Sequence, residues 1–247
     1  MRGLVVSVLI AMSALALSGC ASDRLPPDQA KAAEDANDPF EPMNRTVFDM
    51  NQGFDKAVLL PTAQVYVDVV PDGARDSVHN FIDNLDQPVY FANNVLQGDF
   101  DHAGSTLGRF VINSTIGIGG LFDVASRWDI PNHPEDFGIT LGKWGVGEGP
   151  YLVVPFFGPD NPRDGTGQIV DIFLDPTTYV HIDGHIYWSA GRELAKAIDL
   201  RSRNIDNLDS IERSSVDYYA SMRSLYRQLR NNKIRDGKPD VNALPDL

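Results

Sequence analysis

Apolar residues recur at alternating spacings of three and four along much of the chain, a period typical of amphipathic helices. The first helix is expected to begin near Asp38, a suitable N-cap, with Pro39 or Pro42 in its first turn. It is expected to end at Pro61, because proline interrupts helical hydrogen bonding. Its apolar face is formed by Met43, Val47, Met50, Phe54 and Val58.

The same period predicts more helices downstream. A second helix covers residues 78–85 and is expected to break at Pro88, where a third begins and continues to residue 96. A further helix follows an aspartate that suits an N-cap, either Asp99 or Asp101. Strict two-residue alternation, the mark of a half-buried strand, is nearly absent from this part of the chain.

Residues 117–167 are rich in glycine, proline and aromatic residues, a composition that indicates long irregular loops with a functional role. Within them "YLVVPFF" resembles a strand, and Pro155 limits it to a sheet edge or an extended loop. Long helices are expected again over residues 185–230. The chain therefore predicts an all-α domain over residues 38–233, with irregular Gly/Pro/aromatic loops, and a disordered tail over residues 234–247.

The N-terminus has the layout of a secretory signal peptide, which we assign to residues 1–19. Arg2 precedes an apolar run of about 14 residues, shorter than the roughly 20 needed to cross a bilayer. The chain has one cysteine, Cys20, so an internal disulfide is excluded. "LSGC" resembles the bacterial lipobox, in which the cysteine is acylated. We expect Cys20 to carry the lipid and residues 20–37 to form a lipidated, flexible tether.

The formal net charge of −13 argues against nucleic acid as a partner. Sequence motifs for catalysis are weak. His181 and His185 have the spacing of two metal ligands on a helix, but Gly184 lies between them and the accompanying glutamate is missing. The chain also lacks the Gly-x-Ser-x-Gly signature of one class of serine hydrolases. We therefore expect a protein without catalytic residues, bound metal or cofactor.

Several motifs together resemble one family, the MlaA/VacJ outer-membrane lipoproteins. They cover residues 38–175 and include "DPFEPMNR", "NFIDNLDQPV", "NNVLQGD", "RFVINSTIGIGGLFDVA" and "EDFGITLGKWGVGEGPYLVVPFFGPDNPRDGTG". The resemblance implies a ring of amphipathic helices around a channel, lipid-anchored in or on the inner-leaflet side of the outer membrane of a Gram-negative bacterium. It implies removal of mislocalised phospholipid from the outer leaflet. The implied partners are phospholipid, an outer-membrane porin trimer and a periplasmic lipid-carrier protein.

Such a task needs a polar route for the lipid head group. We expect "RFVINSTIGIGG" to border this route, with Arg109 near the phosphate, although Arg109 equally suits a structural pair with a carboxylate. The candidate lipid-path residues are Arg109, Asn113, Ser114, Gly117, Gly119 and Gly120. The candidate membrane-facing or gating residues are Met43, Val47, Phe48, Asn51, Phe54, Phe156 and Phe157.

Phe48 and Asn51 match an aromatic residue and an asparagine of the family, and we expect them to hold the first helix against the ring. Two other functions remain open from the sequence. One is an adaptor lipoprotein that scaffolds a porin without conducting lipid. The other is a lipoprotein hydrolase.

Overall fold

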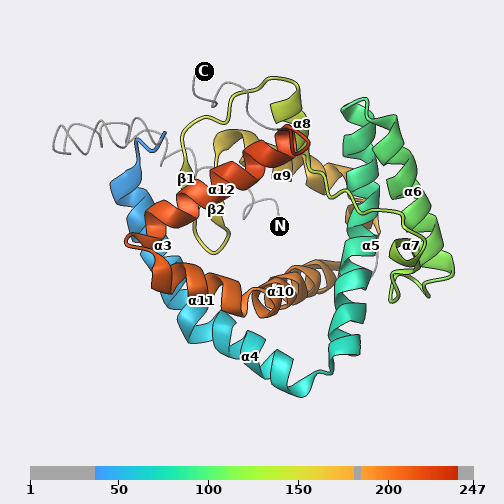
Figure 1. Ribbon diagram of the computed structural model, residues 1–247, viewed down its shortest axis with the longest axis horizontal. Helices are drawn as coiled ribbons and strands as arrows, with labels where there is room; N and C mark the ends of the chain where they lie inside the picture. The colour runs from blue at the N-terminus through green and yellow to red at the C-terminus, as the bar shows by residue number, and fades with distance from the viewer. Residues whose placement is uncertain (1–36, 181–184, 239–247) are drawn as a thin grey trace.

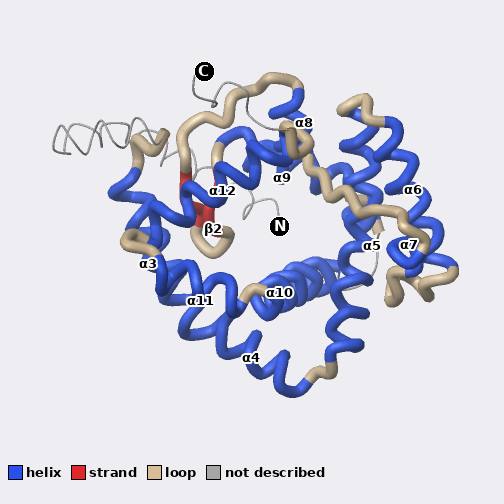
Figure 2. Tube along the Cα trace, viewed as in Figure 1, coloured by secondary structure: helices blue, strands red, loops and turns tan. Residues whose placement is uncertain are grey.

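The computed structural model describes residues 37–180 and 185–238, and nearly all of its regular structure is helical (Figures 1 and 2). The helices are α3 (Glu41–Phe54), α4 (Leu60–Val69), α5 (Asp72–Leu96), α6 (Phe100–Thr115), α7 (Val124–Arg127), α8 (Phe137–Lys143), α9 (Pro162–Leu174), α10 (His185–Arg203), α11 (Ile205–Ser214) and α12 (Tyr218–Ile234). A π-helical turn η2 (Asp55–Leu59), a 3-10 turn η3 (Pro176–Tyr179) and the strands β1 (Leu152–Val154) and β2 (Gly158–Asp160) complete the described elements. The all-α prediction is confirmed.

The helices follow a ring-like outline in Figure 1. There α3 and α4 form one side, α5 forms the next with α6 and α7 outside it, and α8 and α9 lie on the third. Helix α12 runs across the top of the view from α3 towards α8, and α10 packs against α4 and α5. A channel through this ring stays a prediction.

The expectation that Pro61 ends the first helix is wrong. The helical path continues from α3 through η2 into α4, where Pro61 lies in the first turn. In η2 the backbone widens by one residue, so that Leu60 N–H donates to the carbonyl of Asp55. The first turn of a helix tolerates proline, because N–H groups there lack an intrahelical acceptor.

The expected break at Pro88 is also wrong, because α5 continues through it to Leu96. Side chains on both sides of Pro88 are tied to other elements. Gln87 Nε2 donates to Asn132 Oδ1 at 3.0 Å, and Asn93 Nδ2 donates to Asp171 Oδ1 at 2.9 Å. This packing outweighs the cost of proline in a helix interior, which is about 3 kcal/mol.

The long helices expected over residues 185–230 are confirmed as α10, α11 and α12. The chain leaves α11 at Ser214, and Asp217 caps α12 by accepting from Ala220 N–H at 3.1 Å. Helix α12 ends at Ile234, one residue beyond the expected domain boundary. Asp236, in the predicted tail, pairs with Lys143 at 2.6 Å, and residues 239–247 lie outside the described part.

Two asparagines of α3 hold the small β-hairpin in place. Asn44 donates to Tyr151 C=O at 3.0 Å and accepts from Val153 N–H at 2.9 Å. Two helical turns later, Asn51 donates to Val154 C=O at 3.0 Å and accepts from Phe156 N–H at 2.8 Å. The amides thus bind backbone groups in β1 and directly beside it. Strand β1 pairs antiparallel with β2 on its other edge.

Candidate functional site

The distribution of polar and apolar side chains is inverted relative to an ordinary water-soluble protein. Among the described residues, 10 hydrophobic residues are buried, against 18 that are polar or charged. The buried polar set includes Arg109, Arg163 and Arg201, a residue type that is rarely buried unless paired. In the same part of the chain, 30 large hydrophobic residues are exposed. In a protein that faced water on all sides, exposing so many apolar side chains would carry a large free-energy cost.

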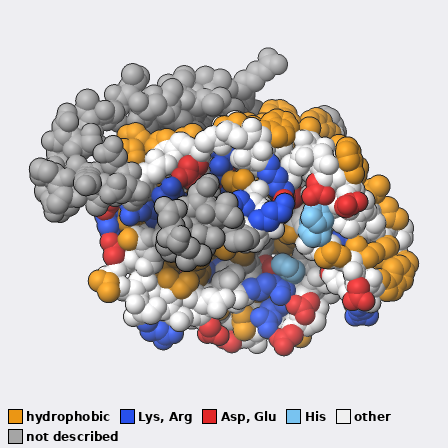
Figure 3. Space-filling model, turned by 45° about the horizontal axis from the view of Figure 1, so that its top comes forward, with side chains coloured by type: hydrophobic (Ala, Val, Ile, Leu, Met, Phe, Trp, Pro, Cys, Tyr) orange, Lys and Arg blue, Asp and Glu red, His pale blue; other side chains and the backbone are white. Residues whose placement is uncertain are grey.

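The exposed apolar side chains recur at helical spacing on outer faces of several helices. Helix α6 exposes Leu107 and Val111, and α9 exposes Ile169, Ile172 and Phe173. Hydrophobic side chains gather along the upper and right-hand rim of the face shown in Figure 3, and charged side chains lie in its middle and along its lower edge. We call the set formed by Leu107, Val111, Ile169, Ile172 and Phe173 the apolar belt.

Arg109 has the second of its two expected environments, a structural pair with a carboxylate. Its side chain is only 2% exposed, and its Nη2 donates to Asp123 Oδ2 at 2.9 Å. Its Nη1 donates to Ser126 Oγ and to Ile130 C=O. Arg109 therefore ties α6 to α7 and the following loop, and its role near a phosphate stays a prediction.

Asp123 is the centre of this junction. Burial raises the pKa of its carboxyl, but hydrogen bonds from Ser126, Asn113 and Arg109 outweigh burial and lower the pKa to about 2. Asn113 donates to Asp123 Oδ1 at 3.0 Å and accepts from Ala125 N–H at 2.9 Å. These predicted lipid-path residues therefore come together in a buried, hydrogen-bonded cluster. The neighbouring Ser114 accepts from Asn84 of α5 at 3.0 Å.

The predicted glycines form a tight turn at the end of α6. Gly119 and Gly120 have positive φ angles of 68° and 92°, which glycine adopts without a side-chain clash. A Cβ on Gly120 would lie 2.5 Å from Asn84 Cβ, and one on Gly117 would lie 2.3 Å from the carbonyl oxygen of Phe122. Close packing against α5 therefore accounts for Gly120, and close approach to the backbone of Phe122 and Asn113 accounts for Gly117. Their part in a lipid path stays a prediction.

The predicted membrane-facing or gating residues divide into two groups. Phe48 is 6% exposed and packs edge-on against Tyr218 and Tyr219 of α12, with Val47 beside this cluster and Met43 half-buried. Together with the Asn51 contacts to the hairpin, this confirms that Phe48 and Asn51 hold α3 in place. Phe48 is buried and Asn51 is half-buried, and a membrane-facing or gating role for either residue stays a prediction.

The second group lies at the tip of the hairpin. Phe156 and Phe157 are 67% and 80% exposed. Phe54, at the end of α3, packs edge-on against Phe156 with ring centroids 5.2 Å apart. These three aromatic side chains remain candidates for contact with lipid. Their role in gating stays a prediction.

Three arginines of α12 were not identified from the sequence, although their spacing of four and three places them on one helix face. Arg223 pairs with Asp38 at 2.7 Å, and Arg227 pairs with Glu148 at 2.6 Å. Arg230 pairs with both Asp136 and Asp164. Asp38 is thus a buried ion-pair partner, and the predicted N-cap position belongs to Phe40. The arginines connect α12 to the start of α3, the loop before β1, and the helices α8 and α9.

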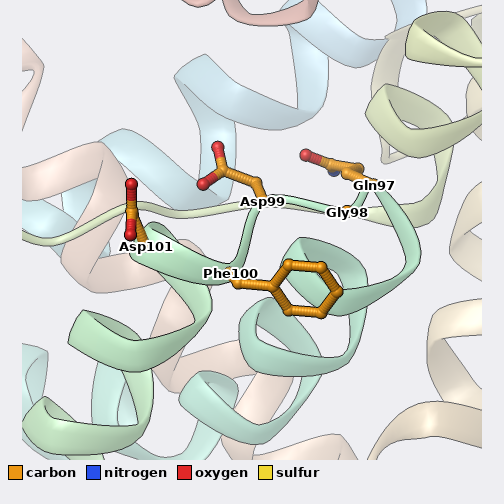
Figure 4. Close-up of a pocket in the computed structure, with 5 residues that line it drawn as sticks. All are labelled: Gln97, Gly98, Asp99, Phe100 and Asp101. Carbon is orange, nitrogen blue, oxygen red and sulfur yellow. The ribbon is translucent and has the colours of Figure 1, made fainter.

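A surface hollow of about 420 Å³ lies where α5 turns into α6 (Figure 4). Asp99 and Asp101 point to one side of this turn, while the ring of Phe100 points away from them. Asp99 accepts from the backbone N–H of His102 at 3.1 Å, which confirms it as the N-cap of α6. The described residues include no group of three or more acidic, histidine or cysteine side chains that suits a metal ion. Cys20 and His181 lie outside the described residues.

In the described part of the chain, no helix is long and apolar enough to cross a membrane. The family model of the MlaA lipoprotein matches residues 36–233. The chain belongs to the MlaA lipoprotein family. Nearly all the described elements, from α3 to α12, lie within the matched range, and so do the residues of the apolar belt and of the buried cluster around Arg109.

Two named relatives of the MlaA family align over most of their length. The "Intermembrane phospholipid transport system lipoprotein MlaA" of Haemophilus influenzae is 33% identical over 95% of this chain and 93% of its own. The protein of the same name from Escherichia coli K12 is 34% identical over 94% of this chain and 91% of its own. A solved structure reported as "Structural basis for maintenance of bacterial outer membrane lipid asymmetry" matches with a TM-score of 0.73 at 34% identity, covering 80% of this chain and 98% of that chain.

Proposed function

We propose that this protein is an outer-membrane lipoprotein that removes mislocalised phospholipids from the outer leaflet and passes them to a periplasmic carrier. The names of the relatives, which place them in intermembrane phospholipid transport, support this assignment. The observation that carries the proposal is the inverted distribution of side chains, with 18 buried polar residues and 30 exposed large hydrophobic residues among those described. Such a protein is stable where hydrocarbon surrounds it.

The physical barrier to moving a phospholipid explains why this arrangement suits transport. Exposing one acyl chain of about 16 carbons to water costs on the order of 10 kcal/mol. The head group has the opposite preference, because its charges are costly in hydrocarbon. A ring that is apolar outside and polar within keeps the tails in the membrane while the head group follows the protein. We propose that a channel through the ring provides the polar part of this route.

The protein is proposed to be anchored by acylated Cys20 and to lie in or on the inner-leaflet side of the outer membrane. A tether of the length of residues 20–37 keeps the folded domain near its lipid anchor. The apolar belt on α6 and α9 and the aromatic tip of the hairpin supply the surface that contacts acyl chains. Lipid transport, rather than catalysis, is the proposed activity.

We propose that an outer-membrane porin trimer and a periplasmic lipid-carrier protein are the partners. Energy for net transport must come from such partners, because the sequence lacks a nucleotide-binding motif. In the alternative adaptor function, the protein binds a porin but does not conduct lipid. The two are separated by purifying the protein and analysing bound lipid, since only a transporter carries chemically unchanged phospholipid. Release of fatty acid would instead indicate a hydrolase.

The main test measures phospholipid in the outer leaflet of cells, labelled by an amine reagent that does not cross the membrane. Deleting the gene is expected to increase labelled phosphatidylethanolamine, and the wild-type protein is expected to reverse this increase. Leu107→Glu and Phe173→Glu place charges in the apolar belt and are expected to restore asymmetry poorly. Gln228→Glu, at an exposed polar position of α12, is the matched control and is expected to restore it fully. Unchanged labelling after deletion would overturn the proposal.

A further inference from the structure

A groove of about 320 Å³ lies between α5 and α10 and is not part of any site described above. Helix α5 contributes Phe81, and α10 contributes Trp188, Gly191 and Arg192. Leu121, from the loop after α6, also lines the groove. Apart from Arg192, its walls are made of hydrophobic, aromatic and glycine residues. The groove therefore combines an apolar lining with one cation.

We propose that this groove binds one acyl chain of a phospholipid. The inference rests on the proposed function, and it assigns a specific binding site to the lipid tail. The volume is at the lower end of the range of ligand pockets, which begins at about 300 Å³. The lining is apolar apart from one buried guanidinium, which suits a hydrocarbon chain that is joined to a polar ester. A single extended hydrocarbon chain is the occupant whose shape and polarity match.

Arg192 supplies a polar contact for the ester group that links the acyl chain to the head group. Its side chain is only 8% exposed, and its Nη atoms are bonded to Asp86 and to Asp175, the latter at 2.6 Å. Its Nε is buried and has no hydrogen-bond partner among the described residues. An ester or phosphate oxygen of a lipid in the groove would give this donor an acceptor.

The rim of the groove has the composition of a membrane–water boundary. Tyr187 and Trp188 are 81% and 41% exposed, and such amphipathic rings favour the head-group region of a bilayer. Lys196, one turn beyond Arg192, keeps 46% of its side chain exposed while it pairs with Asp86 at 2.7 Å. A phospholipid seated here has its tail against α5 and its anionic head among these groups.

Gly191 allows the groove to be filled without disturbing the backbone. A Cβ at Gly191 would meet no atom within 4 Å, so Gly191→Trp projects a large side chain into open space. Gly104 of α6 is a matched control, because it is also a helical glycine with nothing within 4 Å of its Cβ. Both substitutions replace glycine inside a helix, and only the first occupies the groove.

The test uses the full-length protein in nanodiscs of phosphatidylethanolamine and phosphatidylglycerol that carry a diazirine on one acyl chain. After illumination, adducts are mapped by mass spectrometry. Wild-type protein is expected to give adducts at Phe81, in the groove, and at Phe173, in the apolar belt. Gly191→Trp is expected to lose the Phe81 adduct and keep the Phe173 adduct, whereas Gly104→Trp keeps both.

The two proposals fail differently in this experiment. Absence of adducts at both Phe81 and Phe173 of the wild type would count against contact with lipid altogether, and so against both the proposed function and the groove. Two other results would overturn the groove proposal alone, provided that the Phe173 adduct forms. In the first, the wild type gives no adduct at Phe81. In the second, Gly191→Trp gives the same Phe81 adduct as the wild type. If Gly191→Trp melts at a lower temperature than the wild type, the smaller Gly191→Leu replaces it, and the same two adducts decide.

Discussion

Arg230 of α12 and Asp136, the N-cap of α8, form a two-point ion pair across 94 positions of sequence, with Arg230 Nη2 donating to Asp136 Oδ1 at 2.9 Å. The Nε of the same arginine lies 2.8 Å from Asp164 Oδ2, at the start of α9. One side chain therefore connects three helices. Because α12 also reaches the start of α3 through Arg223, it joins the first and last helices of the described residues.

Removing Arg230 is expected to destabilise the fold strongly. Arg230→Gln leaves the carboxylate of Asp164, only 4% exposed, without one of its cations. Breaking a buried ion pair in this way costs about 3 kcal/mol. Lys233→Gln, an exposed basic position on the same helix, is expected to cost less than about 0.5 kcal/mol. Urea unfolding in detergent micelles measures both, and equal losses would contradict a structural role for the pair.

The stability of the fold is expected to fall in acid through Asp164. Burial raises the pKa of Asp164, but the neighbouring Arg230 and Arg163 guanidinium groups outweigh burial and lower the pKa from 3.8 to about 2. The ionised carboxyl therefore stabilises the folded state fully above its unfolded pKa. This contribution decreases by about 1 kcal/mol by pH 3 and by about 2 kcal/mol by pH 2. Unfolding free energies at these pH values should depend less on pH in Asp164→Asn than in the wild type.

Two glycines in the turn after α6 are expected to separate the cost of a positive φ angle from the cost of a steric clash when a methyl group is added. Gly119→Ala introduces a positive φ for alanine but no contact within 4 Å, and we expect a loss of about 1 kcal/mol. Gly120→Ala adds a clash with Asn84, so we expect an additional loss of about 1–3 kcal/mol. Thermal unfolding of both variants checks the order. A smaller loss for Gly120→Ala would show that α5 gives way easily.

How far the sequence predicts this structure depends on the distance between interacting residues. The local period predicted that these segments are helical and narrowed the N-cap of α6 to Asp99 or Asp101, because these features depend on residues a few positions apart. It failed at Pro61 and Pro88, where a π-helical turn and packing from distant helices outweigh the local preference of proline. Proline therefore predicts the end of a helix only where tertiary packing does not stabilise the helical path on both sides of it.

The candidate site shows the same limit. From the sequence, Arg109 suited both a contact with lipid phosphate and an ion pair with a carboxylate. The ion pair forms with Asp123, which lies 14 positions away and outside the helical period of α6. The Asn44 and Asn51 contacts lie more than 100 positions apart in sequence, and no local pattern announces them. The exposed apolar belt was equally hidden, because period alone does not tell a face that meets protein from one that meets lipid.

The hairpin tip offers a test of whether Asn51 orders the backbone at this point. Asn51 holds Phe156 N–H and Val154 C=O, and Phe156 itself has a positive φ of 67°. Without that amide, the tip loses two hydrogen bonds and the backbone strain at Phe156 is no longer opposed. Asn51→Ala is therefore expected to increase the amide exchange rate of Phe156. Asn207→Ala, on exposed α11, is the control and should leave that rate unchanged.

Phe157 is expected to separate a lipid-contacting role from a structural one. Its side chain is 80% exposed, so Phe157→Ser should change the free energy of unfolding by less than about 0.5 kcal/mol. If the tip contacts acyl chains, the same variant should restore outer-leaflet phospholipid levels less completely than the wild type in the deletion strain. Full restoration by a stably folded Phe157→Ser would assign the tip no part in lipid transport. A fold as unstable as that of Arg230→Gln would instead mean that the ring of Phe157 packs within the protein.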